Sequence, residues 1–572
     1  MAGRGGTAYT RRAWMLALVI AAATALGVSG CFDRIAPEIG AIASPAHRST
    51  VTGVVTVSAE VTDDQEVAAV TYRIDGGAGV SMAYVGNDTW QAPFATTAAA
   101  DGRHTLQVTA RDAAGNRAAE TVTVAINNGG GWTETALDRY VAKPDSVFSW
   151  EHYYTKYDLG YTTYFIDMTS QEWRAANEVN RTAWQHDVRV IVPWDCGSNR
   201  TAVLLVDGGS NAAERPTDVD SEYGLLALLA KSVFIQLCQV PNQPLYFADE
   251  HSQARREDAL LAYSLDKCLV TGDEEWPAHL PMAKAVLRAM DTVQAFLPTQ
   301  GKQVDDFILV GFSKRAWTIW LTAAVDWEGR VKAILPGSFD VLNIEPQMDH
   351  HWEAYGFYAP AIDDYAGYDL FCRMASPGGY ELLDTVDPYA YRARYTMPKF
   401  IVNSTGDQFF LPDSSPFYYH DLPGRKILRY TINTDHGQST EIPDLRALIA
   451  WAKDIMNGTD DPEFDWHFEA DGSIRVVCAD RPAAVKLWQA TNPAARDFRK
   501  EIIGGVFTST ALEDTGGGVY VGYVAPPAQG WSAFLVEVTY ERGGPLAADR
   551  VYTTDVRVTP DVLPFEGTHC TD

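Results

Sequence analysis

The serine at position 313 has a sequence context that is typical of an enzymatic nucleophile. It follows the apolar run "DDFILV" and the pair "GF", and it precedes the helical pattern "KRAWTIWLTAAVD". A serine on a sharp turn from strand to helix presents its hydroxyl above a sheet, provided that the neighbouring residues are small. Gly311 meets that requirement, but Arg315 occupies the place where a second small residue is usual. Because serine is also a common helix N-cap, the turn alone leaves both interpretations open.

An acid and a histidine follow Ser313 at the ends of two later apolar runs. Asp407 ends "PKFIVNSTGD", and His436 ends "KILRYTINTDH". Parallel strands bring their carboxyl ends to one edge of a sheet, so the sequence predicts that the three side chains meet there. The histidine would accept the serine proton and return it to the leaving group, while the carboxylate orients the imidazole. Asp413 and Asp435 are rival acids that rank below Asp407, because the former lies beyond a proline and the latter directly precedes the histidine.

Backbone amides are expected to stabilise the oxyanion that forms when a serine attacks a carbonyl. The residue after the nucleophile supplies one donor, and a loop after an earlier strand supplies the other. These are Lys314 and the pair Gly208 and Gly209 of "LLVDGGSN", where glycine permits close backbone approach. A simple turn explains the two glycines equally well.

Short apolar runs that alternate with longer helical patterns extend from about 129 to 462. Continuous apolar strands separated by amphipathic helices indicate a doubly wound, mostly parallel α/β sheet that helices cover on both faces. The order Ser, Asp, His along such a sheet is that of an α/β-hydrolase. An aromatic-rich insert at about 343–395 is expected to form a lid or wall over the site. The strand-like runs are "HDVRVIVP", "TAVLLVDGG", "SVFIQLC", "DDFILVGFS", "VKAILPGSFD", "PKFIVNSTGD" and "KILRYTIN".

Sequence typical of β-structure flanks this region on both sides. Residues 32–128 alternate β-branched runs with turn signals at the spacing of a β-sandwich, and they resemble bacterial Ig-like modules. We expect this module to be a spacer, with Asp112, Gly115 and Asn116 shaping a turn rather than binding calcium. Residues 463–572 return to strand-like runs and predict a small C-terminal β domain.

Residues 1–31 predict export from a bacterial cell. An arginine pair precedes the apolar run "AWMLALVIAAATALGVSGC", which is short for a membrane span and ends in small residues. Its end, "VSGC", resembles a lipobox whose cysteine, Cys31, is acylated, and ordinary cleavage nearby is the alternative. The protein is therefore expected on the periplasmic or surface side of the cell envelope, with a lipid anchor as its membrane contact. Export makes the other cysteines candidates for disulfides, and their spacing predicts no metal site; they stand at 196, 238, 268, 372, 478 and 570.

The composition argues against two classes of partner. The 572-residue chain carries a formal net charge of −28. Such a surface repels nucleic acid and anionic lipid, so we expect neither as a partner. Hydrophobic residues make up 46% of the chain, which is enough for several packed cores.

Several motifs resemble the PhoPQ-activated pathogenicity-related protein family across roughly residues 134–572. They are "GGSN", "ARREDALLAYSLDKCLVTGDEEWPAHLPMAKAVLRAMDTVQAF", "GFSKRAWTIWLTAAVD", "NSTGDQFFLPDSS", "YTINTDHG" and "LWQATNPAARDFR". The resemblance implies an α/β-hydrolase that is related in fold to serine peptidases. It also makes Arg315 part of a Ser-Lys-Arg motif, with Ala316 as a mild departure from the glycine that the family commonly has there.

Charged residues outside the expected triad have alternative interpretations. Arg315 is expected to pair internally rather than to bind substrate. Glu257 and Asp258 either bind a substrate amine or, more simply, begin a helix. The adjacent His350 and His351 point in different directions, which argues against a metal pair.

These observations predict an exported, lipid-anchored serine hydrolase that attacks an ester or peptide carbonyl through an acyl-enzyme and needs no cofactor. One alternative is a carbohydrate esterase of the glucuronoyl type. The other is a surface binding or signalling protein that keeps the fold without using it for catalysis. The sequence does not identify the substrate or the oligomeric state.

Overall fold

The chain divides into two compact units, with the boundary between Glu134 and Thr135. The computed structural model describes residues 35–46, 49–128, 134–197, 199–250, 253–438, 442–542, 548–567 and 569–570. The predicted signal peptide and Cys31 lie outside the described residues. No helix in the described ranges is long and apolar enough to cross a membrane.

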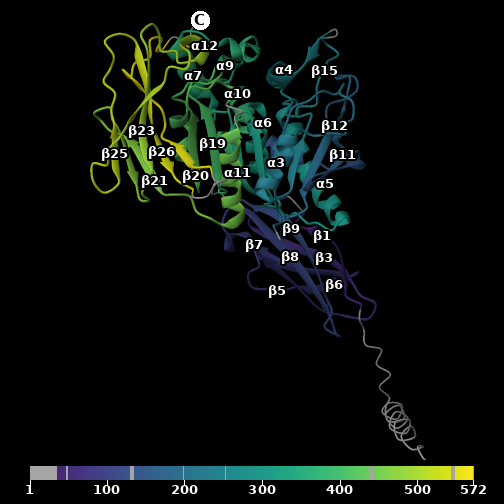
Figure 1. Ribbon diagram of the computed structural model, residues 1–572. Helices are drawn as coiled ribbons and strands as arrows, with labels where there is room; N and C mark the ends of the chain where they lie inside the picture. Colours follow the sequence, from purple (N-terminus) through teal and green to yellow (C-terminus); the bar gives the residue numbers. More distant parts are fainter. Residues whose placement is uncertain are drawn as a thin grey trace, which may run out of the picture. The chain divides into compact units, whose positions relative to one another are not determined.

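The first unit is a β-sandwich (Figure 1). One sheet has the order β1 (Glu38–Ser44), β3 (Val54–Thr62), β7 (Thr89–Ala95), β6 (Ala83–Gly86). The other has the order β2 (Thr50–Val51), β9 (Arg117–Ile126), β8 (Gly102–Asp112), β4 (Val67–Ile74), β5 (Val80–Ser81). Alternate residues of the strands point inward, so that Val57, Val70, Leu106 and Val108 form part of one apolar core.

The turn around Asp112 has the structure that its residues predict. The Asp112 carboxylate accepts hydrogen bonds from the backbone N–H groups of Gly115, at 2.5 Å, and Asn116, at 2.8 Å. Burial alone would raise the pKa of Asp112, but a hydrogen bond from the Asn116 side chain and these backbone bonds lower it. The predicted turn is therefore confirmed.

The second unit is built around a twisted sheet whose parallel part holds the candidate site. Its strands are, in spatial order, β10 (Ser149–Asp158), β11 (Tyr161–Glu172), β12 (Ala183–Pro193), β14 (Phe234–Leu237), β13 (Thr201–Val206), β17 (Asp306–Phe312), β18 (Val331–Gly337), β19 (Lys399–Ser404) and β20 (Lys426–Thr431). The strands from β14 to β20 are parallel, and β10, β11 and β12 are antiparallel to their neighbours. Every strand-like run of the prediction lies in this sheet, whereas β10 and β11 were not predicted.

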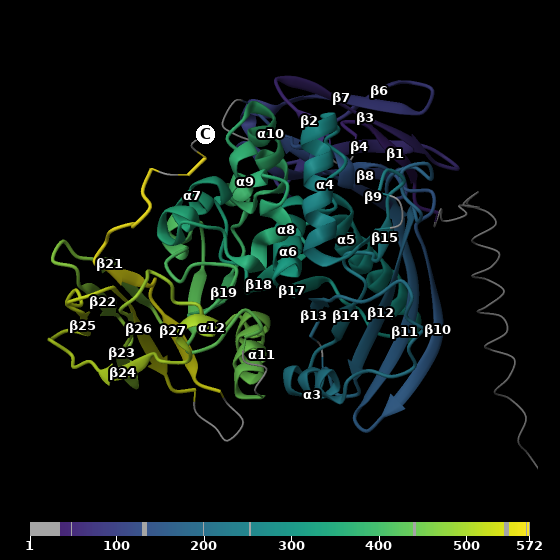
Figure 2. The same ribbon diagram turned by 90° about the horizontal axis from the view of Figure 1, so that it is seen from above.

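Helices cover both faces of this sheet, as predicted. Helix α5 (His279–Phe296) packs on α6 (Lys314–Val325) over one face. Helix α3 (Ser221–Ala230) packs on α11 (Ile442–Asn457) over the other (Figure 2). Almost every residue of α6 is buried, because the helix is apolar nearly all round and packs against β17, β18 and α5. The helix that follows Ser313 is thus held firmly on both sides.

A helical insert separates β18 from β19, close to the predicted range of about 343–395. It contains α7 (Ile344–Tyr355), η3 (Pro360–Ile362), α8 (Asp363–Ala366), α9 (Leu370–Arg373), α10 (Pro377–Val386) and η4 (Pro388–Arg394). A disulfide joins Cys372 of α9 to Cys570 near the end of the chain, 198 positions later. Within the described residues the other cysteines are free; they are Cys196, Cys238, Cys268 and Cys478.

The C-terminal strands form sheets within the second unit. One sheet has the order β21 (Phe464–Phe468), β22 (Ile474–Cys478), β25 (Val519–Gly522). The other contains β24 (Thr508–Ala511), β23 (Ala484–Asn492), β26 (Trp531–Tyr540), β27 (Arg550–Thr553) and β28 (Arg557–Thr559). Strand β27 packs against β20, and the N–H of Tyr430 donates to the Thr553 hydroxyl. The predicted C-terminal β region therefore packs on the α/β core within the second compact unit.

Candidate active site

Ser313 lies on a strained turn between strand β17 and helix α6. Its backbone φ is 56° and its ψ is −130°. A non-glycine residue in such a conformation costs about 1–3 kcal/mol and persists only where the surroundings impose it. The Ser313 N–H donates to the carbonyl of Gly337 on the neighbouring strand, at 2.8 Å, and its carbonyl accepts from Ala316 and Trp317 in the first turn of α6. Ser313 is therefore held by backbone contacts on both sides.

Two glycines make room for this turn: Gly311 on β17, just before the turn, and Gly337 at the end of the neighbouring strand β18. A Cβ at Gly311 would lie 2.5 Å from the carbonyl oxygen of Arg315, and a Cβ at Gly337 would lie 2.4 Å from the Phe312 ring. The side chain of Arg315, in contrast, points away from the turn. It donates from Nε to the carbonyl of Val240 and from Nη2 to Glu257, both at 2.7 Å. The predicted internal pairing of Arg315 is confirmed.

The structure brings Ser313, His436 and Asp407 into one hydrogen-bonded row. Ser313 Oγ lies 2.9 Å from His436 Nε2. His436 Nδ1 lies 3.0 Å and 2.9 Å from the two carboxylate oxygens of Asp407. Asp407 is buried, whereas the His436 side chain keeps some exposure. With Nδ1 donating to the carboxylate, Nε2 is free of a proton and can accept that of the serine.

The rival acids have other partners. Asp413 forms ion pairs with Arg496 and, at 3.1 Å, with His350. Burial alone would raise the pKa of Asp413, but the charges of these partners hold it well below its usual range. Asp435 accepts from the N–H of Gly437 at 3.1 Å. Of the candidate carboxylates, Asp407 is the one whose oxygens contact the ring of His436.

Several residues that sequence reasoning missed fix the position of His436. The Ser338 hydroxyl donates to the His436 carbonyl at 2.8 Å, and the His436 N–H donates to the Gln408 side chain at 2.8 Å. The ring of Phe409 lies over the imidazole, with centroids 4.0 Å apart. Gln408 and Phe409 could have been predicted from the sequence, because they directly follow Asp407 and the same loop must bring them close to the site.

A second buried carboxyl lies behind the row. Asp340 accepts hydrogen bonds from the hydroxyls of Tyr418, at 2.7 Å, and Tyr430, at 2.6 Å. Burial raises the pKa of Asp340 to about 8, and the negative charge of Asp407 acts in the same direction. A neutral Asp340 avoids placing a second buried negative charge beside the Asp407 carboxylate.

The predicted oxyanion donors differ in what they already bind. Lys314 is the first residue of α6, where backbone N–H groups have no partner within the helix and the dipole favours negative charge. The N–H of Gly208 donates to the carboxylate of Asp207 at 2.7 Å, so this amide is engaged. A Cβ at Gly208 would lie 2.7 Å from Arg315 Nη2, which gives the glycine a packing role. The amide of Gly209 as a second donor stays a prediction.

The cations of the Ser-Lys-Arg sequence meet acids at the start of helix α4 (Glu257–Thr271). Lys314 Nζ lies 3.1 Å from Glu257 and 3.0 Å from Asp258. Burial would raise the pKa of Glu257, but its hydrogen bond to Arg315 and the two positive charges lower it to about 2. The two acids thus neutralise the two cationic side chains that follow Ser313. Both acids lie in the first turn of α4, in agreement with the simpler of their two predicted roles, which was to begin a helix.

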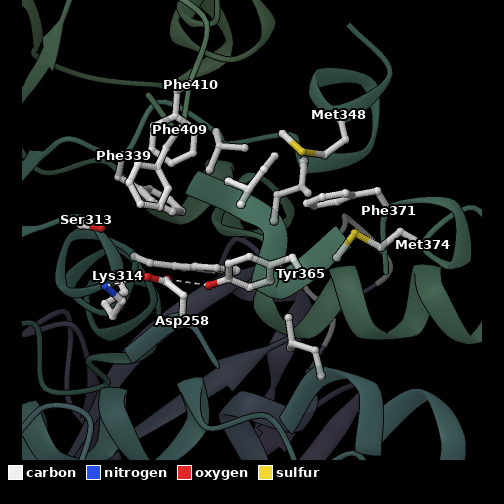
Figure 3. A pocket seen from close by; sticks show the side chains of 15 residues that line it. Asp258, Ser313, Lys314, Phe339, Met348, Tyr365, Phe371, Met374, Phe409 and Phe410 are labelled. Carbon is white, nitrogen blue, oxygen red and sulfur yellow. Dashed lines mark hydrogen bonds and ion pairs between the residues drawn. The ribbon is translucent and has the colours of Figure 1, made fainter. Parts of the chain in front are cut away.

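An apolar pocket opens beside Ser313 (Figure 3). The empty space between its walls is about 560 Å³ when the open solvent at its mouth is included. Its walls come from α4, α6, the helical insert and the loops after β18 and β19. The lining residues are Asp258, Leu265, Ser313, Lys314, Trp317, Phe339, Val341, Ile344, Met348, Ile362, Tyr365, Phe371, Met374, Phe409 and Phe410. The insert therefore forms a wall of the pocket.

The histidines of the insert have separate partners. His350 faces Asp413, and His351 Nε2 accepts from the N–H of Ala359 at 3.0 Å. Among the described residues, Cys372, His569 and Cys570 lie close enough together to suggest a metal site, but the two sulfurs are already bonded to each other. A thiolate ligand is not available from such a pair.

The parallel sheet, the strained serine turn and the chain order of Ser313, Asp407 and His436 define an α/β-hydrolase fold. The sequence profile of the PhoPQ-activated pathogenicity-related protein family matches residues 137–499, and that of the bacterial Ig domain matches residues 40–108. The chain therefore belongs to the PhoPQ-activated pathogenicity-related protein family, with an Ig-like module before the family region.

Individual proteins resemble the chain to different degrees. Autocrine proliferation repressor protein A of Dictyostelium discoideum is 34% identical over 457 residues, which is 75% of this chain and 92% of that protein. Acetyl xylan esterase 1 from Thermoanaerobacterium sp. JW/SL YS485 is 14% identical with a TM-score of 0.39, over 57% of this chain and 95% of that chain. An acetyl xylan esterase from Paenibacillus sp. R4 is 15% identical with the same TM-score of 0.39, over 57% and 96%.

Proposed function

We propose that this protein is an exported serine hydrolase in which Ser313 attacks an ester or peptide carbonyl. The observation that carries the proposal is the row from Ser313 Oγ to His436 Nε2, at 2.9 Å, and from His436 Nδ1 to the buried Asp407. The backbone of the same serine is strained, with a φ of 56° and a ψ of −130°. A serine that only capped the helix would need neither the histidine nor the strain, and its side chain makes no capping bond.

The reaction follows from this geometry. As Ser313 Oγ bonds to the carbonyl carbon, its proton passes to His436 Nε2, and Asp407 stabilises the imidazolium. His436 then donates the proton to the departing alcohol or amine, which leaves an acyl-enzyme. Water gives a proton to His436 and its oxygen to the acyl carbon, and the proton returns to Ser313 as the acid is released. The Lys314 amide is the proposed donor to the oxyanion in both steps.

A fluorophosphonate probe, which phosphonylates activated serines, tests the proposal. We expect the wild type to be labelled, and Ser313→Ala and His436→Ala to lose labelling and hydrolysis of ester and peptide libraries. Ser509→Ala is the matched control, because Ser509 is exposed on β24. Absence of labelling that depends on Ser313, together with no turnover in the libraries, would disprove a serine hydrolase.

Two alternatives make different predictions. The name of the Dictyostelium relative describes a regulator of proliferation, which favours a signalling role as the second candidate. A signalling protein without catalysis would keep its cellular effect in Ser313→Ala.

A glucuronoyl-type esterase is less favoured, because the described lining of the pocket beside Ser313 offers sugar hydroxyls few polar partners. Its test is hydrolysis of a methyl glucuronate against simple alkyl esters.

We further propose that the protein is anchored in the cell envelope through an acylated Cys31, with the Ig-like module as a spacer. The support is the residue pattern that ends in "VSGC". Incorporation of labelled palmitate by the wild type, and its loss in Cys31→Ser, is the expected outcome. Equal labelling of both proteins would contradict the anchor and leave the hydrolase proposal intact.

A further inference from the structure

The pocket beside Ser313 has the chemistry of a binding site for an uncharged apolar group. Aromatic, branched and sulfur-containing side chains make up most of its lining. Trp317 and Phe339 stack with centroids 5.2 Å apart, and Phe410 meets Phe339 edge-on at 6.0 Å. Met348 and Met374 add flexible apolar side chains from the insert. A group bound here exchanges water contacts for apolar ones.

Apart from Ser313, the charged and hydroxyl-bearing side chains of the lining bind one another. Asp258 accepts from the Tyr365 hydroxyl at 2.9 Å and pairs with Lys314 Nζ at 3.0 Å. Lys314 is buried, and its ammonium group contacts the carboxylates of α4 rather than the interior of the pocket. A charged group of a substrate would therefore lose its hydration without gaining a partner, which is costly.

The pocket lies on the acyl side of the attacked carbonyl. The departing oxygen or nitrogen must lie next to His436 Nε2, because His436 gives it a proton. His436 and Asp407 are not part of the described pocket lining, whereas Ser313 and Lys314 are. Phe409 and Phe410, which lie beside the His436 ring, form the wall nearest the acid–base pair, and the rest of the space extends from Ser313 toward the insert, where we place the carbonyl substituent.

The shape of the pocket favours an elongated or flat group. In Figure 3, Ser313 lies at one end, and Met348, Phe371 and Met374 lie at the other. Phe339 and Phe409 lie above the space between them, and Asp258 and Tyr365 lie below it. An acetyl group would occupy only the end next to Ser313 and leave the remaining apolar surface uncovered.

We infer that the pocket takes a bulky, uncharged acyl group, either an alkyl chain of about six to ten carbons or an aromatic acid, as the acyl part of the substrate. The inference rests on the proposed function, which makes Ser313 the nucleophile. The reaction is the hydrolysis of such an ester: the bond between the acyl carbon and the alcohol oxygen breaks, and water supplies the hydroxyl of the acid and the proton of the alcohol. Met348, Phe371 and Met374 set the length of the chain.

A series of p-nitrophenyl esters from acetyl to decanoyl measures this preference in the full chain. Each added methylene that is buried should raise kcat/KM by about fourfold until the pocket is filled. Met374→Trp should lower the ratio of octanoyl to acetyl kcat/KM at least tenfold, and Met374→Ala should move the optimum to longer chains. Val270→Trp is the control, because Val270 is exposed at the end of α4 and outside the pocket, and it should leave the ratio unchanged.

Binding to Ser313→Ala separates failure of this inference from failure of the proposed function. Calorimetric titration with methyl octanoate and methyl acetate should show that Ser313→Ala binds the octanoate more tightly and that Met374→Trp in the same background removes the difference. Turnover that depends on Ser313 but is fastest with acetyl esters would overturn the inference alone. If no ester or peptide is turned over but the binding difference holds, the pocket assignment stands and the proposed hydrolase is wrong. Equal binding of both esters would overturn the pocket assignment.

Discussion

The turn that carries Ser313 and the loops that carry Asp407 and His436 are held in different ways. The serine turn is fixed by its own strand and helix and by Gly337 of the next strand. The loop of Asp407 is fixed by residues far along the chain: the N–H of Lys500 donates to the carbonyl of Gly406 at 3.0 Å, and Arg496 pairs with Asp413. One part of the site is therefore local in sequence, and the other depends on the C-terminal region.

This difference explains why the C-terminal strands belong to the same compact unit as the sheet. A Cβ at Gly406 would lie 2.8 Å from the Cβ of Lys500, so the two segments are in close contact. The Asn433 side chain donates to the carbonyl of Phe507 at 3.0 Å, and the N–H of Phe507 donates back to it at 2.9 Å. The segment 496–507 thus supports the loops of both the acid and the histidine.

Removal of the carboxylate should have the largest effect on activity. Asp407→Asn keeps the size of the side chain but no longer fixes His436 with its Nδ1 proton toward the acid. We expect kcat to fall by about 10³–10⁴-fold, with little change in stability. Steady-state kinetics on the best ester measures the loss. Asp435→Asn is the matched control, and a similar fall in that variant would show that the acid has been assigned wrongly.

The sequence could predict the local half of the site because its signals are local. The apolar strand, Gly311 and the following helix identify Ser313 as the turn residue, and chain order places Asp407 and His436 at the same sheet edge. What could not be predicted are contacts between segments far apart, such as those of Arg496 with Asp413. Hydrophobic periodicity describes which face of an element is buried, and it does not specify which loop an arginine about 80 residues later will reach.

Strands β10 and β11, at one end of the sheet, show the same limit. Strand β10 has little burial, with a pattern of exposed and partly buried residues, so its sequence lacks the continuous apolar run of the central strands. Its partner β11 is mostly buried. The sequence of β11, "YTTYFIDMTSQE", places polar residues between its apolar ones, so it also lacks the continuous apolar run by which the parallel strands were predicted.

Breaking the distant support should reduce stability. Arg496→Met leaves the carboxylate of Asp413, which is 11% exposed, with His350 as its remaining ion-pair partner, and we expect unfolding to become easier by about 3 kcal/mol. Chemical denaturation measures the change. The double variant Arg496→Met/Asp413→Asn should recover part of the loss, because it removes the buried charge. Arg139→Met, at an exposed pair with Glu274, should cost less than about 1 kcal/mol. If the two arginine variants are equally stable, the C-terminal segment does not support the acid loop.

Breaking the local support should have a smaller effect on stability but a direct effect on the serine. Gly311→Ala places a Cβ 2.5 Å from the Arg315 carbonyl oxygen, so the turn must shift at a cost of about 1–3 kcal/mol. We expect slower labelling of Ser313 by the fluorophosphonate probe along with a lower melting temperature. Gly378→Ala in α10 is the control, because its Cβ would meet nothing within 4 Å. Unchanged labelling of Gly311→Ala would show that the turn tolerates a side chain at this position.

The smallest expected effect concerns Glu257, which pairs with both Lys314 and Arg315. The effect is a dependence of stability on pH. The folded-state pKa of Glu257 is about 2, below its ordinary value of 4.5, so its contribution to stability is present above about pH 4.5 and is lost as the pH falls toward 2. Glu257→Gln should therefore lower the melting temperature at pH 7 and approach the wild type near pH 2. Glu274→Gln, at the exposed pair with Arg139, should follow the wild type throughout. If the difference in melting temperature between the wild type and Glu257→Gln did not change with pH, the negative charge of Glu257 would not stabilise the fold. Lys314 and Arg315 would then be held beside Ser313 by their other contacts.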